Sequence, residues 1–483
     1  MTTPNDVNTP SLAWQEMAKT WEITDPLRGG TRAMRDAGTA LLPRFPLETS
    51  EAYDFRRGNS FLFPSYDETI KRLVARPFSR AIVLQGTDGL DDRLAAIEFD
   101  ADGTGRSLTE FARAWFTDAV DRGLSHILVE FPKNEKRSVD DSVRPYFVHV
   151  SPRDLIGGPG RQGLDRIRIR ECVTKQVDEF GEVEVRRVRV IKLLRDDQGK
   201  LTGEGAWELH EENDKGDFVV IEEGPYDLER IALATLPINV TGPLTGVSPL
   251  ESLAWVNVRH WQSSSDQNHA LAFARSGLLF AKGWDEKQVS ENLRAVGPNR
   301  VVFHKDPEAD LKYVEHSGAS IQAGERDIDK LERQMEVLGN KPMMRRTGTT
   351  TATERVADEG DADCAVKAWI QLAEAALYQA FELAALWLDV ALPDDFAVNI
   401  YSDFRALDSS DGADSVQKAR DNRDISLETY LTEMQRRGVL SEDLKIEDEI
   451  ERIEKEAAAV PAVSPPIVLG EDPVDPVEES SAA

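Results

Sequence analysis

Apolar positions in the first quarter of the chain recur mainly at helical spacing. Residues 12–80 are expected to be mostly helical, and a helix over 67–75 places its apolar residues on one face. Ser107 and Glu110 have the spacing of a capping box, which predicts a helix that ends at Gly123. Two apolar stretches that follow predict strands: SHILVEF (125–131) and RPYFVHV (144–150).

The hydrophobic period changes to two between residues 164 and 221. Four alternating stretches are separated by the turn-rich sequences DEFGE, DDQGK and NDKG, which predicts a β-meander over 164–222. Two interpretations fit the alternating arginine and valine residues, a basic contact strip and an ordinary solvated face. We favour the solvated face, because polar-out alternation is common in antiparallel sheets.

Long helices dominate residues 249–388. The sequence SPLE at 248–251 offers an N-cap, a proline at the first helical position and a capping-box glutamate, so a helix is expected to about Phe273. Next, GLLFAKG predicts a strand, DEKQVSENLRAVG a helix, and RVVFHK with DLKYVEH a strand pair. A second long helix over 321–338 carries apolar residues at spacings of three, four and three, typical of a packed helix pair: Ile328, Leu331, Met335 and Leu338.

A third long helix is predicted from a capping box at Thr351 and Glu354 to about Leu388, with a kink at Gly360. The basic sequence NKPMMRRTGTTT, which precedes it, is loop-like. FAVNIYSDF then predicts a strand, two acidic stretches (414–437 and 441–459) predict helices, and 460–483 has the composition of a disordered tail. The fold class is therefore α+β.

The chain of 483 residues has a formal net charge of −29. Such acidity repels phosphate, so a broad basic surface that wraps nucleic acid is not expected, whereas an acidic passage would let DNA slide. Cys172 and Cys364 are too few for a disulfide framework, and both are expected as buried thiols in a reducing cytosol. Neither a secretion signal nor an apolar run of membrane-spanning length is seen.

Catalytic and cofactor motifs are not found in the sequence. The string GPGRQG (158–163) matches a dinucleotide-binding pattern, but the residues that follow favour a strand and not the required helix. His260 and His269 fall on opposite faces of one predicted helix, which does not suit a zinc site. We therefore predict no cofactor and no enzymatic activity. The alternative is an uncharacterised soluble hydrolase with an acidic site.

The order of the predicted elements is long helix, small mixed module, long helix, basic threonine-rich loop and kinked helix. This order resembles the portal proteins, or head–tail connectors, of tailed bacteriophages. The resemblance covers Leu41 to Glu456 and lies in the order of many weak segments, among them ALLPRFPLETSEAYDFRRGNSFLFPSYDETIKRLVARPF, GLSHILVEFP, RPYFVHVSPRDLIG, PLESLAWVNVRHWQSSSDQNHALAFARSG, TATERVADEG and SLETYLTEMQRRGVL.

The resemblance implies a portal-like division of the chain. The expected parts are an α/β wing with the meander (1–248), a first stem helix (249–275), a clip (276–318), a second stem helix (319–339), a tunnel loop (340–351), a kinked wing helix and strand (352–405), a helical crown (406–459) and a disordered tail (460–483).

A portal protein would form a homo-oligomeric ring, usually of twelve subunits, at one vertex of the capsid in the virion, assembled in the host cytoplasm. The implied partners are double-stranded DNA passing through the channel, terminase, an adaptor or head-completion protein, and the major capsid or scaffold protein, with no membrane. Docking of these partners is expected at four clip residues: Trp284, Lys287, Arg294 and Arg300.

The tunnel loop is the basic exception in an acidic chain. The resemblance favours contacts to DNA phosphates by three cations, with weaker hydrogen bonds from three threonines, over an ordinary surface loop: Lys341, Arg345, Arg346, Thr347, Thr349 and Thr350. Another structural protein of the phage head, such as a capsid or adaptor subunit, is the further alternative.

Overall fold

The computed structural model describes residues 6–132, 143–158, 163–196, 198, 200–276, 278–284, 307–314, 318–339, 352–402, 410–436, 439–440 and 444–459. The chain divides into two compact units, Met1–Ser402 and Asp403–Ala483, which are described separately.

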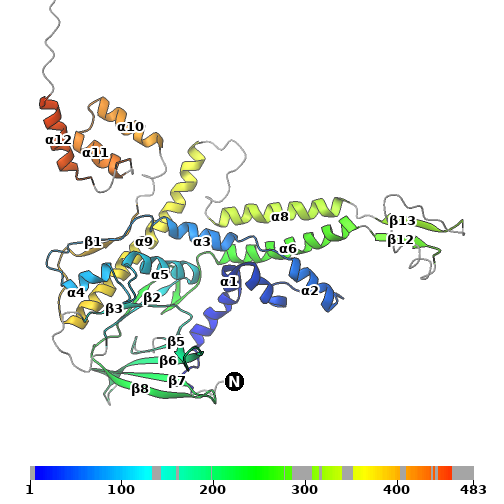
Figure 1. Cartoon of the computed structure of the whole chain (residues 1–483), viewed down its shortest axis with the longest axis horizontal. Helices are drawn as coiled ribbons and strands as arrows, with labels where there is room; N and C mark the ends of the chain where they lie inside the picture. Colours follow the sequence, from blue (N-terminus) through cyan, green and yellow to red (C-terminus); the bar gives the residue numbers. More distant parts are fainter. Residues whose placement is uncertain are drawn as a thin grey trace, which may run out of the picture. The chain divides into compact units, whose positions relative to one another are not determined.

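Helices make up most of the first 122 residues, as the sequence predicts (Figure 1). They are α1 (Leu12–Asp36), η1 (Gly38–Ala40), α2 (Ser50–Asn59), α3 (Ser65–Ala75), α4 (Asp92–Ala95), η2 (Ala96–Glu98) and α5 (Leu108–Arg122). Both bonds of the capping box between Ser107 and Glu110 are present, and Gly123 caps α5 in the left-handed conformation with φ of 86°. The predicted start and end of this helix are therefore confirmed.

A three-stranded antiparallel sheet forms the centre of the first unit. Its strand order is β3 (Tyr146–Val150), β2 (Ser125–Glu130) and β9 (Leu233–Leu236). Helices α5 and α9 (Ala352–Leu388) pack against it. The ring centroids of Phe147 and Phe381 lie 5.5 Å apart, which joins β3 to α9 in a fully buried core. The later part of α9 is buried as well, at Val366, Ile370 and Phe381.

The predicted four-stranded meander is present, and one further strand before the predicted range makes it a five-stranded antiparallel sheet in sequential order. Its strands are β4 (Leu155–Gly157), β5 (Arg166–Gln176), β6 (Glu182–Arg195), β7 (Leu201–Glu212) and β8 (Phe218–Tyr226). Cations on β5 and β6 pair with acids on β7, since Lys175 and Arg187 both bind Glu211, at 2.6 and 2.9 Å. These pairs favour the ordinary solvated face over a basic contact strip.

Cys172 corrects one sequence expectation, because its side chain is exposed and not buried. Strand β4 pairs with β5 at Ile169, so Cys172 lies beyond the part of β5 that β4 covers. The other cysteine, Cys364, has no described side-chain environment.

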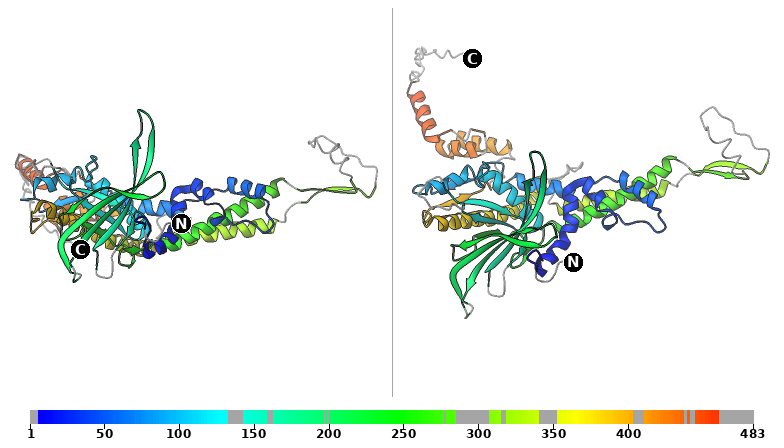
Figure 2. Two further views of the ribbon diagram at one scale, coloured as in Figure 1. Left: turned by 90° about the horizontal axis from the view of Figure 1, so that it is seen from below. Right: turned by 60° about the horizontal axis from the view of Figure 1, so that its bottom comes forward.

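The predicted long helices are present as α6 (Glu251–Ser276), α8 (Gly318–Leu338) and α9. A hairpin of β12 (Leu278–Lys282) and β13 (Asp310–Val314) lies at the far end of the α6–α8 pair (Figure 2). The strand DLKYV therefore pairs with LLFAK. RVVFHK (300–305), its predicted partner, lies outside the described residues. Helix α9 runs through Gly360 as one helix, and the kink there stays a prediction.

The described part of the first unit contains four further short strands, with β1 (Val83–Gln85) pairing to β14 (Ala397–Asn399) and β10 (Val240–Gly242) pairing to β11 (Thr245–Gly246). The described part of the second unit contains α10 (Ser410–Asp421), α11 (Leu427–Arg436) and α12 (Ile446–Ala459). The first predicted acidic helix is thus two helices. No helix in the described part of the chain is long and apolar enough to span a membrane.

Candidate functional site: the α6–α8 helix pair

Polar contacts hold α6 and α8 side by side in antiparallel orientation (Figure 1). Gln267 Nε2 donates to the carbonyl of Ile321 at 2.9 Å, and Ser263 Oγ donates to Asp327 at 2.9 Å. Further along, His260 Nε2 lies 3.5 Å from a carboxylate oxygen of Glu332. Residue numbers fall on one helix as they rise on the other, so the two helices run in opposite directions.

Apolar packing accompanies these polar contacts along α8. Leu331 and Met335, two of the four residues of the predicted seam, are buried, and Ile328 is half-buried. Leu338 at the end of the helix keeps 37% of its surface exposed in the single chain. Packing of these four residues as one seam stays a prediction.

The opposite side of α6 is bound to the segment between η1 and α3. Asn257 is fully buried and bridges two backbone groups, since its Oδ1 accepts from Tyr66 N and its Nδ2 donates to the Phe63 carbonyl, both at 2.9 Å. Ser60 Oγ donates to Ser265 Oγ at 2.8 Å. Helix α6 is consequently fixed from two sides, which explains why its polar residues are buried.

A buried ion pair organises the loop beside α2 and α6. Arg56 donates two hydrogen bonds of 2.8 Å to Glu48 and one of 2.7 Å to the Pro43 carbonyl, and its guanidinium lies 4.1 Å from the ring centroid of Phe45. The hydrogen bond from Arg56 holds the pKa of Glu48 below its usual range. Burial raises the pKa of the neighbouring Asp266, against the attraction of Arg56. The Arg56–Glu48 pair joins α2 to the loop before it, and Arg56 contacts α6 through Asp266 at 3.6 Å.

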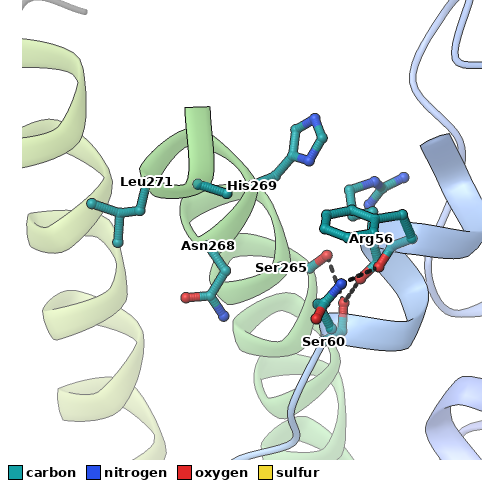
Figure 3. A pocket seen from close by; sticks show the side chains of 9 residues that line it. Arg56, Ser60, Ser265, Asn268, His269 and Leu271 are labelled. Atoms are coloured by element: carbon teal, nitrogen blue, oxygen red, sulfur yellow. Dashed lines mark hydrogen bonds between the residues drawn. The ribbon is translucent and has the colours of Figure 1, made fainter. Parts of the chain in front are cut away.

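A pocket lies beside this ion pair, between α2 and α6 (Figure 3). Its lining residues include Phe55, Asn59, Asn268, His269 and Leu271. Ser60 and Ser265, joined by their hydrogen bond, form part of its wall. The lining mixes amides, hydroxyls and apolar groups with the His269 ring and the Arg56 guanidinium, and the two serine hydroxyls bind each other and the Arg56 carbonyl.

Most predicted functional residues lie outside the described residues. This applies to the whole tunnel-loop set, Lys341, Arg345, Arg346, Thr347, Thr349 and Thr350, and to the clip residues Lys287, Arg294 and Arg300. Trp284, directly after β12, is half-buried. Docking at the clip and DNA contact by the loop accordingly stay predictions.

The structure brings together Asp118, Ser125 and His149, which the sequence did not single out. Ser125 Oγ lies 2.9 Å from His149 Nε2, and Asp118 Oδ2 lies 3.3 Å from the same nitrogen. A catalytic triad needs the carboxylate on the other ring nitrogen and a nucleophile that substrate can reach. Ser125 is completely buried in β2, so these contacts stabilise the core and do not favour the hydrolase alternative.

No group of three or more histidine, cysteine, aspartate or glutamate side chains in the described ranges could hold a metal ion. The residues that follow GPGRQG form strand β5, as expected, and not a helix that could bind a pyrophosphate.

The sequence prediction did not include the polar contacts between α6 and α8, although the spacing of the polar residues on α6 carries a signal for them. His260, Ser263 and Gln267 recur at spacings of three and four, the same spacing as the apolar residues of α8. Such a polar stripe normally indicates a solvated face. Here it faces a partner helix, and burial lowers the pKa of His260 while Glu332 opposes this shift.

A fully buried histidine in β2, the middle strand of the three-stranded sheet, makes the stability of the first unit depend on pH. Burial lowers the pKa of His126 from 6.5 to about 3, and its Nδ1 lies 2.9 Å from Thr235 Oγ1. Below pH 6.5 the unfolded chain binds a proton that the folded chain excludes, so His126 should cost about 1.4 kcal/mol of stability per pH unit as the pH falls toward 4. Asp121 acts in the opposite direction, because burial raises its pKa to about 6.

The variant His126→Gln separates the two effects, because only the histidine is removed. Urea unfolding measures the free energy of unfolding of the native chain and of the variant. The native value minus the variant value should decrease as the pH is lowered from 6 to 4. His126→Asn, which also lacks a titrating ring, should reproduce the profile of His126→Gln. Parallel pH profiles for the native chain and both variants would contradict this account.

Comparison with known proteins adds one match over the helix pair. The profile of a domain of unknown function, DUF4055, matches residues 249–388, which run from just before α6 to the end of α9. No curated protein matches this chain.

Three solved structures contain chains similar to this one. A chain from "Virion of native gene transfer agent (GTA) particle" is 11% identical, with a TM-score of 0.39 over 87% of this chain and 98% of that one. A chain from "Neck of empty GTA particle computed with C6 symmetry" is 12% identical, with a TM-score of 0.42 over 86% and 96%. A chain from "Neck of native GTA particle computed with C12 symmetry" is 13% identical, with a TM-score of 0.39 over 81% and 94%. TM-scores of this size do not establish a common fold, so no property of these particles is transferred to this chain.

Proposed function

We propose that this chain is a portal subunit that forms a ring at one capsid vertex. The ring would be the channel for packaging and ejection of DNA, and the docking site for terminase and for head-completion or tail proteins. The observation that carries the proposal is the antiparallel α6–α8 pair with the β12–β13 hairpin at its far end, followed in sequence by the basic segment 340–351 and the long helix α9. This is the order of stem, clip, stem, tunnel loop and wing helix in portal proteins.

The interior contacts of the helix pair suit a rigid supporting element. The three polar contacts between α6 and α8 and the buried Leu331 and Met335 lock the two helices in one register. Since α6 is also bound to the α2–α3 segment, the pair is held rigidly against the rest of the first unit. A rigid pair of this kind could hold a channel open while DNA moves.

The tunnel loop would supply the DNA contacts. Lys341, Arg345 and Arg346 would form rings of positive charge in an otherwise acidic channel, where they steady phosphates without trapping them. A head-to-tail contact between identical subunits generates such rings when the rotation closes.

Electron microscopy and a packaging assay test this function. Negative-stain images of the purified chain should show rings with a central hole, and dispersed compact monomers at high protein concentration would overturn the proposal.

In phage particles, Arg345→Ala together with Arg346→Ala should lower the amount of retained DNA, measured after nuclease treatment. Lys367→Ala, a substitution of a half-buried cation on α9, is the matched control. Retention equal to that of the native particle would sink the loop assignment and leave the ring intact.

A further inference from the structure

Helix α8 leaves much of its surface uncovered in the single chain. It packs against α6, and the helices α1 and α2 lie on the other side of α6 (Figures 1 and 2). The buried side of α8 holds Leu331 and Met335, whereas most residues on its remaining sides are charged and exposed. These charged residues are arranged in two lines of opposite sign.

Acidic residues form the first line along α8. Glu325, Asp329, Glu332 and Glu336 are separated by four, three and four positions, which places them on one face of the helix. Glu325 and Asp329 are exposed, and Glu332 and Glu336 are half-buried. Glu332 also lies 3.5 Å from His260, so this line runs along one edge of the contact with α6. We call these four residues the acidic stripe.

Basic residues form the second line. Arg326, Lys330 and Arg333 are separated by four and three positions, and all three are exposed. Among the described residues, none of the three forms an ion pair with an acid of the same chain. We call them the basic stripe. Consecutive residues of an α-helix point about 100° apart, so the basic stripe and the acidic stripe face different directions.

The two stripes together favour a second copy of α8 as the partner. A DNA backbone would be attracted by the basic stripe and repelled by the acidic stripe beside it. A second copy of the helix offers the opposite charge to each stripe. Because the stripes face different directions, one copy can bind a first neighbour through its acidic stripe and a second neighbour through its basic stripe.

The order of the charges along α8 suits neighbours in a closed ring. Each base directly follows an acid in the sequence, at 325–326, 329–330 and 332–333. Copies in a ring are related by a rotation, without a shift along the ring axis. Where α8 runs along that axis, an acid of one copy and the next base of its neighbour differ in height by only about 1.5 Å. Three acid–base pairs can therefore form in one contact.

Exposed apolar side chains lie at one end of the helix pair. Val337 follows Arg333 by four positions, which continues the line of the basic stripe, and it is 57% exposed. Trp255 of α6 is 55% exposed. The helices are antiparallel and His260 lies beside Glu332, so Trp255, five positions earlier, is level with Val337, five positions later. Apolar area of this kind supplies affinity, to which the charges add the choice of partner.

We propose that the acidic stripe of α8 in one subunit binds the basic stripe of α8 in a second copy of this chain. The two surfaces are different faces of one helix, so the contact is head-to-tail and repeats around a ring. Complementary charges fix the register of the neighbours, and like charges disfavour other arrangements. This inference rests on the ring of the proposed function and names the charged contact between its subunits.

Two charge-reversal variants test the contact. Arg326→Glu with Lys330→Glu makes the basic stripe acidic, and Glu325→Lys with Asp329→Lys makes the acidic stripe basic. Each variant alone should raise the concentration of half-maximal ring formation at least about tenfold, measured by mass photometry, because like charges then meet. An equal mixture of the two variants should form rings again, because each variant offers the opposite charge to the other. This recovery also shows that both variants are folded.

Arg72→Glu with Arg113→Glu is the matched control, because it reverses two exposed arginines on α3 and α5 and should assemble as the native chain does. Rings formed by each variant alone, or a mixture that does not recover, would overturn the stripe contact and leave the proposed function standing. Normal assembly of Arg326→Glu with Lys330→Glu, combined with lower DNA retention in particles, would assign the basic stripe to DNA instead. A native chain that stays monomeric would overturn both proposals.

Discussion

Gly123→Ala is expected to lower the free energy of unfolding of the first unit by about 3–5 kcal/mol. Gly123 ends α5 with φ of 86°, a conformation that costs an L-residue about 1–2 kcal/mol. A Cβ at this position would also come within 2.6 Å of the Val247 carbonyl carbon and overlap the neighbouring backbone atoms.

The Val247 backbone has little freedom to move away from this Cβ. Val247 N donates to the Asn239 carbonyl at 3.1 Å, and Asn239 N donates to the Gly123 carbonyl at 2.7 Å. Asn239 thus links the end of α5 at Gly123 to Val247 on the far side of the β10–β11 pair. Moving Val247 would break two hydrogen bonds with Asn239, because Asn239 Nδ2 also donates to the Val247 carbonyl at 2.9 Å.

Gly103→Ala is the matched control for this prediction. Gly103 also has a positive φ of 77°, but a Cβ there meets nothing within 4 Å, so only the conformational cost of about 1–2 kcal/mol should appear. Equilibrium unfolding in urea measures both variants. Equal losses of stability would show that the contact with Val247 contributes nothing.

Arg56→Met should be nearly as damaging, with an expected loss of about 3–5 kcal/mol, because it leaves the buried carboxylate of Glu48 without its partner. Only 1% of the Arg56 side chain and 4% of the Glu48 side chain are exposed. The substitution also removes the hydrogen bond to the Pro43 carbonyl and the contact with the Phe45 ring. The loop before α2 should detach from α6 as a result, and proteolysis in that loop should become faster.

Two further variants separate the ion pair from general damage to α2. Arg57→Met removes an exposed pair with Asp54 one position along the same helix, and it should cost less than about 1 kcal/mol. Combining Arg56→Met with Glu48→Leu removes both charges and should recover much of the loss. A double variant as unstable as Arg56→Met would show that packing, and not the unpaired charge, dominates.

The sequence by itself determined the local elements of this protein. The capping box of Ser107 and Glu110, the left-handed Gly123 and the period-two strands of the meander all depend on interactions between residues a few positions apart. The apolar spacing on α8 also indicated its buried side at Leu331 and Met335. These features are readable because the groups that decide them are neighbours in the chain.

Only the tertiary structure decided which elements meet and which polar groups are buried. The contacts of His260 with Glu332 and of Arg56 with Glu48, and the pairing of β12 with β13, involve partners that spacing alone does not identify. Cys172 shows the same limit, because the alternation along β5 did not reveal that its side chain is exposed. Burial is a property of the assembled surfaces, so the environment of a side chain follows from the fold and not from the local sequence.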